Sequence, residues 1–164
     1  MKLENMEQLF RDELADLYSA EKQLIGALPK VVKATRSAAL KRVVEDHLEE
    51  TREQFARLDR IIGSMQERPK PRTCKAMSGL LKEASGILKA TGSPAVIDAA
   101  IIGAAQRVEH YEIAAYGCAR TYAEMLGLDE AVNLLDQSLS EEKSADEALN
   151  ELALGMINQQ AANA

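Results

Sequence analysis

Aromatic side chains are scarce in this sequence: it has no tryptophan, two phenylalanines and four tyrosines among 164 residues. Only four prolines are present to interrupt helices. The core must therefore be built mainly from aliphatic side chains, and the abundance of alanine, leucine, glutamate and lysine favours helices. The length suits one sizeable hydrophobic core, so we predict a single domain over residues 1–164.

Cysteines are also few, and their number limits the setting of the protein. Cys74 and Cys118 cannot form a disulfide framework and lack CxxC spacing, so we expect free thiols in a reducing cytoplasm. No uninterrupted apolar run approaches 18 residues, and no apolar signal segment is visible, so we expect no membrane association. A net charge of −6 without a basic stripe argues against nucleic acid as a partner.

The spacing of apolar residues predicts four long amphipathic helices and one short helix. A tight turn should join the first two long helices, and another should join the last two. A crossover of about thirty residues separates these two pairs, and it is long enough to travel the length of a bundle. The fold class is therefore all-α, a ferritin-like four-helix bundle whose single long crossover carries the short helix. The expected helices are about 5–34, 38–62, 75–90, 94–126 and 130–158.

Each long helix is predicted to carry a carboxylate close to its apolar face. Glu21, Glu50, Glu112 and Glu142 each lie roughly 14 to 16 positions from the turn that pairs their helix, which at about 1.5 Å per residue places them at one level. An ionised carboxylate in a dry core costs several kcal/mol unless it is paired or bound to a metal. Four carboxylates at one level therefore indicate a cation site.

Helical angles of about 100° per residue add three more polar side chains to this level. His47 falls inside the apolar arc of its helix, Glu109 lies at the flank of its helix, and Asp146 points inward one turn after Glu142. The predicted metal ligands are therefore Glu21, His47, Glu50, Glu109, Glu112, Glu142 and Asp146.

Two nearby residues are placed outside this ligand set. Glu53 points away from the apolar face of its helix and should be solvated. Tyr116 lies between Glu109 and Glu112 in angle, and we expect a core aromatic ring whose hydroxyl bonds to a carboxylate.

Carboxylates with one imidazole and no cysteine favour iron or manganese over a structural zinc site. So many ligands suit two divalent ions bridged by shared glutamates. A ligating histidine needs its second ring nitrogen held by an acceptor, for which Asp46 or a backbone carbonyl is the candidate.

Four blocks of the sequence resemble those of the YciF-like bacterial stress proteins, a group within the ferritin-like superfamily. The blocks are LYSAEKQL at 17–24, HLEET at 47–51, QRVEHYEIA at 106–114 and EEKSAD at 141–146. The resemblance implies a rubrerythrin-type two-metal site in a cytoplasmic homodimer. One departure concerns the Glu-x-x-His motifs of typical sites: the second long helix has His47-x-x-Glu50 in reverse order, and the fourth has no histidine.

The leading hypothesis is a di-iron protein, with manganese as the other candidate metal, that reacts with oxygen or peroxide in stress protection. Because the chain lacks a CxxC electron-donor module, electrons would come from an external partner. Two alternatives stay open: metal buffering without turnover, and a structural or interaction bundle whose acids bind no metal. A storage cage is disfavoured because residues 157–164 look like a frayed polar tail.

Overall fold

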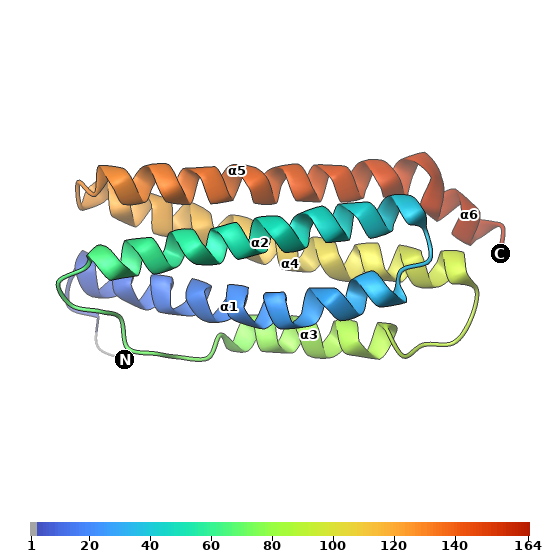
Figure 1. Cartoon of the computed structure of the whole chain (residues 1–164), viewed down its shortest axis with the longest axis horizontal. Coiled ribbons are helices and arrows are strands. Elements are labelled where there is room, and N and C mark those ends of the chain that lie inside the picture. The colour runs from blue at the N-terminus through green and yellow to red at the C-terminus, as the bar shows by residue number, and fades with distance from the viewer. Residues whose placement is uncertain (1–2) are drawn as a thin grey trace.

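A computed structural model describes residues 3–164, and every regular element in that range is a helix (Figure 1). This confirms the predicted all-α, ferritin-like bundle. None of the helices in this part of the chain carries an apolar stretch long enough to cross a lipid bilayer. The helices are α1 (Met6–Ala34), α2 (Ala38–Ser64), α3 (Lys75–Ile87), α4 (Pro94–Met125), α5 (Asp129–Leu152), the π-helical turn η1 (Ala153–Ile157) and α6 (Asn158–Ala162).

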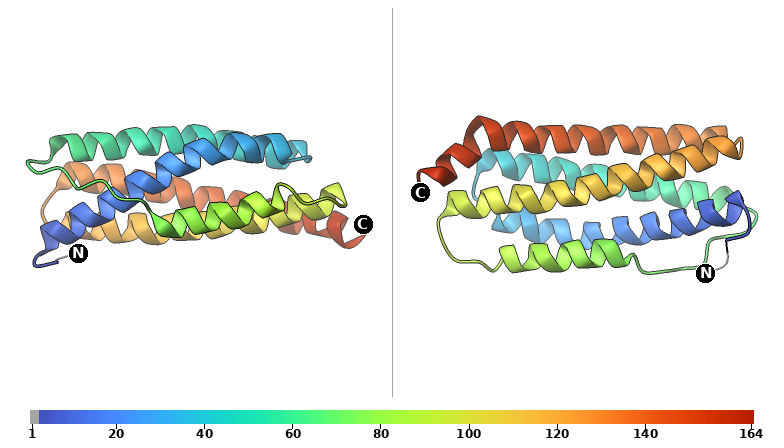
Figure 2. Two further views of the ribbon diagram at one scale, coloured as in Figure 1. Left: turned by 90° about the horizontal axis from the view of Figure 1, so that it is seen from below. Right: turned by 180° about the vertical axis from the view of Figure 1, so that it is seen from behind.

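The helices are arranged as two antiparallel hairpins, α1–α2 and α4–α5, which pack against each other through the pairs α1–α4 and α2–α5. The segment between α2 and α4 returns along the bundle and carries α3. Helix α3 lies on the outside of the bundle and contacts both α1 and α4 (Figure 2). This is the predicted topology with one long crossover.

The core consists of two apolar clusters, one toward each end of the bundle. The cluster at the α1–α2 turn includes Leu24, Leu28, Leu40, Val44, Ile101 and Leu149. The cluster at the α4–α5 turn includes Phe10, Leu14, Leu17, Leu58, Ala119 and Leu135. On α1 the boundary falls between Leu17 and Ala20, so the buried Glu21 lies next to the place where the two clusters meet.

The C-terminal segment is ordered as helix rather than as the frayed tail that we expected. Helical structure continues through the π-turn η1 and α6 as far as Ala162, and α6 contacts α4. Ile157 is almost fully buried and belongs to the cluster at the α1–α2 turn. Burial of this isoleucine therefore explains why the segment stays helical.

The turn between α1 and α2 is fixed by a residue from α4. Asp98 is buried, and its carboxylate accepts hydrogen bonds from the backbone amides of Arg36 (2.9 Å) and Ser37 (2.6 Å). The Ser37 hydroxyl in turn accepts a hydrogen bond from the backbone amide of Leu40 at 3.4 Å and caps α2. Asp98 thus ties the beginning of α4 to the first hairpin.

The opposite turn is closed by a left-handed glycine. Gly127 has φ +68°, a conformation that glycine adopts without steric cost. Its amide bonds to the carbonyl of Glu124, and the amide of Leu128 bonds to the carbonyl of Ala123, which is the Schellman pattern. The two hairpin turns therefore hold the helices at a defined relative height.

Replacing Asp98 with alanine should destabilise the protein. The change leaves the backbone amides of Arg36 and Ser37, in a partly buried turn, without their carboxylate acceptor, for which we expect a loss of about 1–3 kcal/mol in unfolding free energy. Denaturant titration measures this loss. Asp59→Ala, on the exposed face of α2, is the matched control and should change stability by less than about 0.5 kcal/mol. Equal effects of the two changes would contradict the role of Asp98.

Candidate metal centre

Polar side chains from four helices form one buried layer between the two apolar clusters. Each comes from a position with helical spacing to the apolar residues of its own helix, so helix packing carries it inward. Glu21 comes from α1, and α2 supplies His47 and Gln54. The other members of the layer are Glu109 and Glu112 from α4 and Glu142 from α5.

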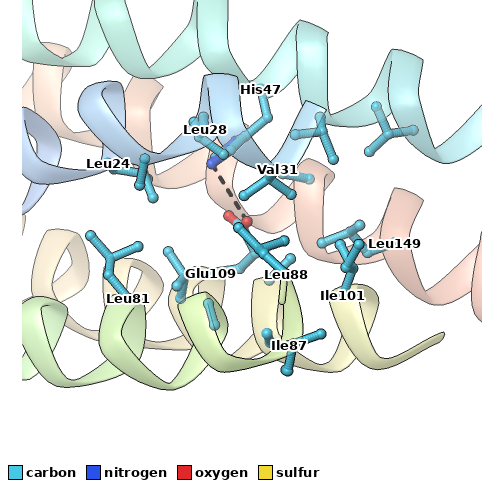
Figure 3. Close-up of a pocket in the computed structure, with 18 residues that line it drawn as sticks. Leu24, Leu28, Val31, His47, Leu81, Ile87, Leu88, Ile101, Glu109 and Leu149 are labelled. Carbon is cyan, nitrogen blue, oxygen red and sulfur yellow. Dashed lines mark ion pairs between the residues drawn. The ribbon is translucent and has the colours of Figure 1, made fainter. Parts of the chain in front are cut away.

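Four of these side chains meet closely enough to share a cation. His47, Glu109, Glu112 and Glu142 each offer one ligand atom, and these four atoms lie within 4.8 Å of one another. The nearest imidazole contact is His47 Nε2 to Glu109 Oε1 at 3.5 Å (Figure 3). Three helices thus contribute to a group that can hold a metal ion.

Glu21 completes the layer from α1. Its side chain is fully buried, and the hydroxyl of the equally buried Tyr116 donates a hydrogen bond to Glu21 Oε1. The prediction of a core tyrosine bonded to a carboxylate is therefore confirmed.

Many polar atoms of the layer have no hydrogen-bond partner among the side chains and backbone of residues 3–164. They are Glu21 Oε2, both ring nitrogens of His47, Gln54 Oε1, Glu109 Oε2, both oxygens of Glu112 and Glu142 Oε2. Unpaired buried polar atoms are rare in stable proteins because each one costs free energy. So many in one layer fit a site that is completed by cations. The expectation that Asp46 or a carbonyl holds the second nitrogen of His47 is wrong, since neither nitrogen is hydrogen-bonded.

Burial also changes the protonation of the layer. Desolvation, followed by repulsion from Glu142, raises the pKa of Glu21, Glu109 and Glu112 well above the usual glutamate value. Desolvation raises the pKa of Glu142 to about 7. Desolvation lowers the pKa of His47 to about 4, so its imidazole is neutral at neutral pH, which is the form that binds metals. Without a cation the layer therefore favours protonated carboxyl groups.

Two of the predicted ligands lie at the edge of the layer. Glu50 is partly buried and is not in the four-residue group; desolvation, followed by repulsion from Glu141 and Asp46, raises its pKa. Asp146 is also partly buried, accepts a hydrogen bond from Gln106 Nε2 at 3.3 Å and lies 3.3 Å from His110 Nε2. Their assignment as ligands stays a prediction, whereas the other five candidates share the buried layer.

Gln54 is the member of the layer that the sequence reading missed. Its amide nitrogen donates hydrogen bonds to Glu142 Oε1 and, at 3.1 Å, to Glu141 Oε2. Gln54 follows His47 by seven residues, a spacing that returns to the same helical face and would have revealed it. Glu53, one position earlier, is exposed as predicted.

The fold and the buried layer together define a class of protein. A four-helix bundle with one long crossover and a buried carboxylate–histidine layer at mid-height is a ferritin-like protein. The family described as "Domain of unknown function (DUF892)" matches residues 5–162. The chain therefore belongs to the DUF892 family.

A bacterial stress protein is similar to this chain in both sequence and structure. Protein YciF of Escherichia coli K12 is 44% identical over 164 residues, which are 99% of each chain. The crystal structure of that stress protein superposes with a TM-score of 0.90 and covers 94% of this chain and 98% of its own. The predicted resemblance to YciF-like stress proteins is confirmed.

Two further solved structures are similar. YcfI of Rhodopseudomonas palustris, described as a candidate structural protein, is 41% identical with a TM-score of 0.86, covering 91% of this chain and 95% of its own. A protein of Xanthomonas campestris is 22% identical with a TM-score of 0.76, covering 94% of this chain and 95% of its own, and supports the fold alone.

The metal-free protein should lose stability as the pH rises from 6.5 to 8. Carboxyl groups whose pKa is raised by folding bind protons in the folded state that the unfolded chain releases, so their stabilisation disappears as pH rises. His47 opposes this trend weakly near pH 6.5, because the unfolded imidazole is still partly protonated there while the buried ring, with a pKa of about 4, is neutral, and this opposing contribution fades toward pH 8. We expect the free energy of unfolding to fall by about 1.4 kcal/mol per pH unit for each proton that the folded state binds in excess of the unfolded chain.

Denaturant unfolding in the presence of a chelator, at constant ionic strength, measures this slope. The protein with bound metal should show the opposite trend, because the ions displace the protons and bind more tightly at higher pH. A metal-free stability that is flat or rising between pH 6.5 and 8 would contradict the protonated layer.

Proposed function

We propose that the buried layer binds two divalent metal ions, iron or manganese, and that the protein reacts with oxygen or peroxide in stress protection. The observation that carries the proposal is the group of His47, Glu109, Glu112 and Glu142, whose ligand atoms lie within 4.8 Å of one another. Most of the unpaired buried polar atoms of the layer belong to these same residues. The relative described as a stress protein supports the physiological setting.

The charges of the layer support two ions rather than one. Glu21, Glu109, Glu112 and Glu142 carry four negative charges when ionised, and all four are buried. Two divalent cations balance these charges, whereas one leaves a net charge of −2 in a low-dielectric core, which is costly. Oxygen ligands with a single imidazole suit iron or manganese.

The surrounding side chains orient the oxygens that would bind the ions. Tyr116 holds Glu21 Oε1 and leaves Oε2 without a partner. Gln54 holds Glu142 Oε1 and likewise leaves Oε2 unpaired. Each hydrogen bond therefore fixes the rotation of one carboxylate, as supporting groups do in metal sites.

The bound ions would supply redox chemistry and polarisation of an oxygen substrate. Residues of the chain contribute exclusion of water, since the layer is closed above and below by the two apolar clusters. Repeated turnover would need an external electron donor, because Cys74 and Cys118 do not form a CxxC module. A homodimer, expected from the resemblance, is part of the proposal and is checked by sedimentation.

One observation favours a second candidate. YcfI, at 41% identity, is described as a candidate structural protein. In a purely structural bundle the layer would remain protonated and would bind no metal. Metal loading separates these two functions.

Reconstitution with Fe²⁺ or Mn²⁺ should load about two ions per chain and raise the melting temperature. Glu112→Gln removes a ligand whose two oxygens are both unpaired, so it should weaken metal binding at least about tenfold. Elemental analysis and thermal melting measure both effects. Glu53→Gln, on the exposed face of α2, is the matched control and should bind normally.

Glu112→Leu gives a second arm to this experiment. It removes a buried carboxylate, so the metal-free protein should become equally or more stable, by about 0–4 kcal/mol, while the metal-induced rise in melting temperature disappears. Less than about 0.2 ions per wild-type chain after reconstitution would contradict the metal site and favour the structural bundle.

A further inference from the structure

An apolar pocket with a volume of about 50 Å³ lies beside the metal centre, within the cluster at the α1–α2 turn (Figure 3). Residues from all five main helices line it. Of the eighteen lining residues, only His47 and Glu109 have polar side chains. Both belong to the four-residue metal group, so the pocket is in direct contact with the centre.

The crossover helix supplies one wall of this pocket. Leu81, Ala84 and Ile87 line it from α3, and Leu88 lines it from the C-cap of this helix. Helix α3 offers no residue to the metal group. Opposite walls include Leu24 and Leu28 of α1, Val43 of α2 and Ile101 of α4. The position of α3 along α1 and α4 thus completes an apolar compartment next to the site.

The side of the metal centre that faces away from α3 is polar. Along the α2–α5 contact, Gln54 bonds to Glu142, and Arg57 bonds to Glu141 at 2.5 and 2.7 Å. Glu50 is partly buried on the same face of α2. Charged and hydrogen-bonding species therefore meet matching groups on the α2–α5 side, while the α3 side offers them almost none.

We propose that the α3-side pocket binds dioxygen next to His47 and Glu109. The inference rests on the proposed metal function and identifies dioxygen, rather than peroxide, as the oxidant that uses this side. Hydrogen peroxide would give up its hydrogen bonds to water on entering an apolar lining, whereas dioxygen has none to lose. Apolar cavities of about 150 Å³ hold benzene or xenon, so a space about one third that size suits a molecule of a few atoms.

Xenon tests the pocket in metal-free protein, independently of any reaction. A saturable ¹²⁹Xe chemical-shift change is expected for the wild type. Ala84→Leu fills the pocket from α3 and should weaken xenon binding at least about fivefold, whereas Leu88→Ala enlarges it and should strengthen binding. Ala76→Leu, at an exposed position of the same helix, is the control and should leave xenon binding unchanged.

Rapid mixing of the ferrous protein with each oxidant tests the link to the centre. Ala84→Leu should slow oxidation by dioxygen at least about fivefold and change oxidation by hydrogen peroxide by less than about twofold, while Ala76→Leu changes neither. Equal slowing with both oxidants, or slowing with neither, would overturn the assignment of dioxygen to the pocket.

A failure of the proposed metal function and a failure of the dioxygen pocket give different results. If the wild type binds no iron, the proposed function fails, and with it the link between pocket and oxidant. If iron binds but xenon does not, or if xenon binds equally to wild type and Ala84→Leu, the pocket assignment alone is overturned.

Discussion

The burial of four glutamates at one level of the bundle is the constraint on which the rest of this structure depends. Glu21, Glu109, Glu112 and Glu142 are excluded from water, and no lysine or arginine joins them in the layer within residues 3–164. Ionised, they would repel one another in a medium that cannot screen them. The folded protein is therefore stable in two states of this layer, one with protons on the carboxyl groups and one with cations bound between them.

The apolar clusters, the hairpin turns and two hydrogen-bonding side chains hold this layer in place. Apolar clusters on both sides supply the burial free energy that offsets the polar groups. Asp98 and the Gly127 turn fix the heights of the two hairpins, so that residues far apart in the sequence meet at one level. Tyr116 and Gln54 then set the rotation of individual carboxylates.

The two sides of the layer also differ in polarity, because the crossover helix α3 covers only one of them. By packing along α1 and α4, helix α3 makes the surroundings of His47 and Glu109 apolar, while the α2–α5 side keeps ionic contacts such as Arg57 with Glu141. Such a division would let a metal centre receive ions or protons from one side and an uncharged molecule from the other.

Much of this arrangement could be predicted from residue spacing. Glu21, Glu112 and Glu142 interrupt apolar stripes at positions whose heights agree, and helical geometry carries that pattern directly into three dimensions. Glu50 has the matching height, but its position at the flank of the apolar arc leaves it only partly buried. Asp146 points to the seam with α4, where Gln106 and His110 contact it.

Other features depend on tertiary contacts that periodicity does not encode. The spacing of Gln54 from His47 places its side chain inward, but only the packing of α2 against α5 shows that its amide holds Glu142. Asp98 acts across the bundle on a turn more than sixty residues away in sequence. The apolar pocket requires knowing against which helices α3 packs, and the amphipathic pattern of α3 alone does not determine that.

Diffraction at the iron absorption edge, from crystals of the iron-reconstituted protein, tests the central claim most directly. Two anomalous peaks are expected within the buried layer, one of them among His47, Glu109, Glu112 and Glu142. A fully reduced, iron-saturated crystal with no anomalous peak in this layer would contradict that claim.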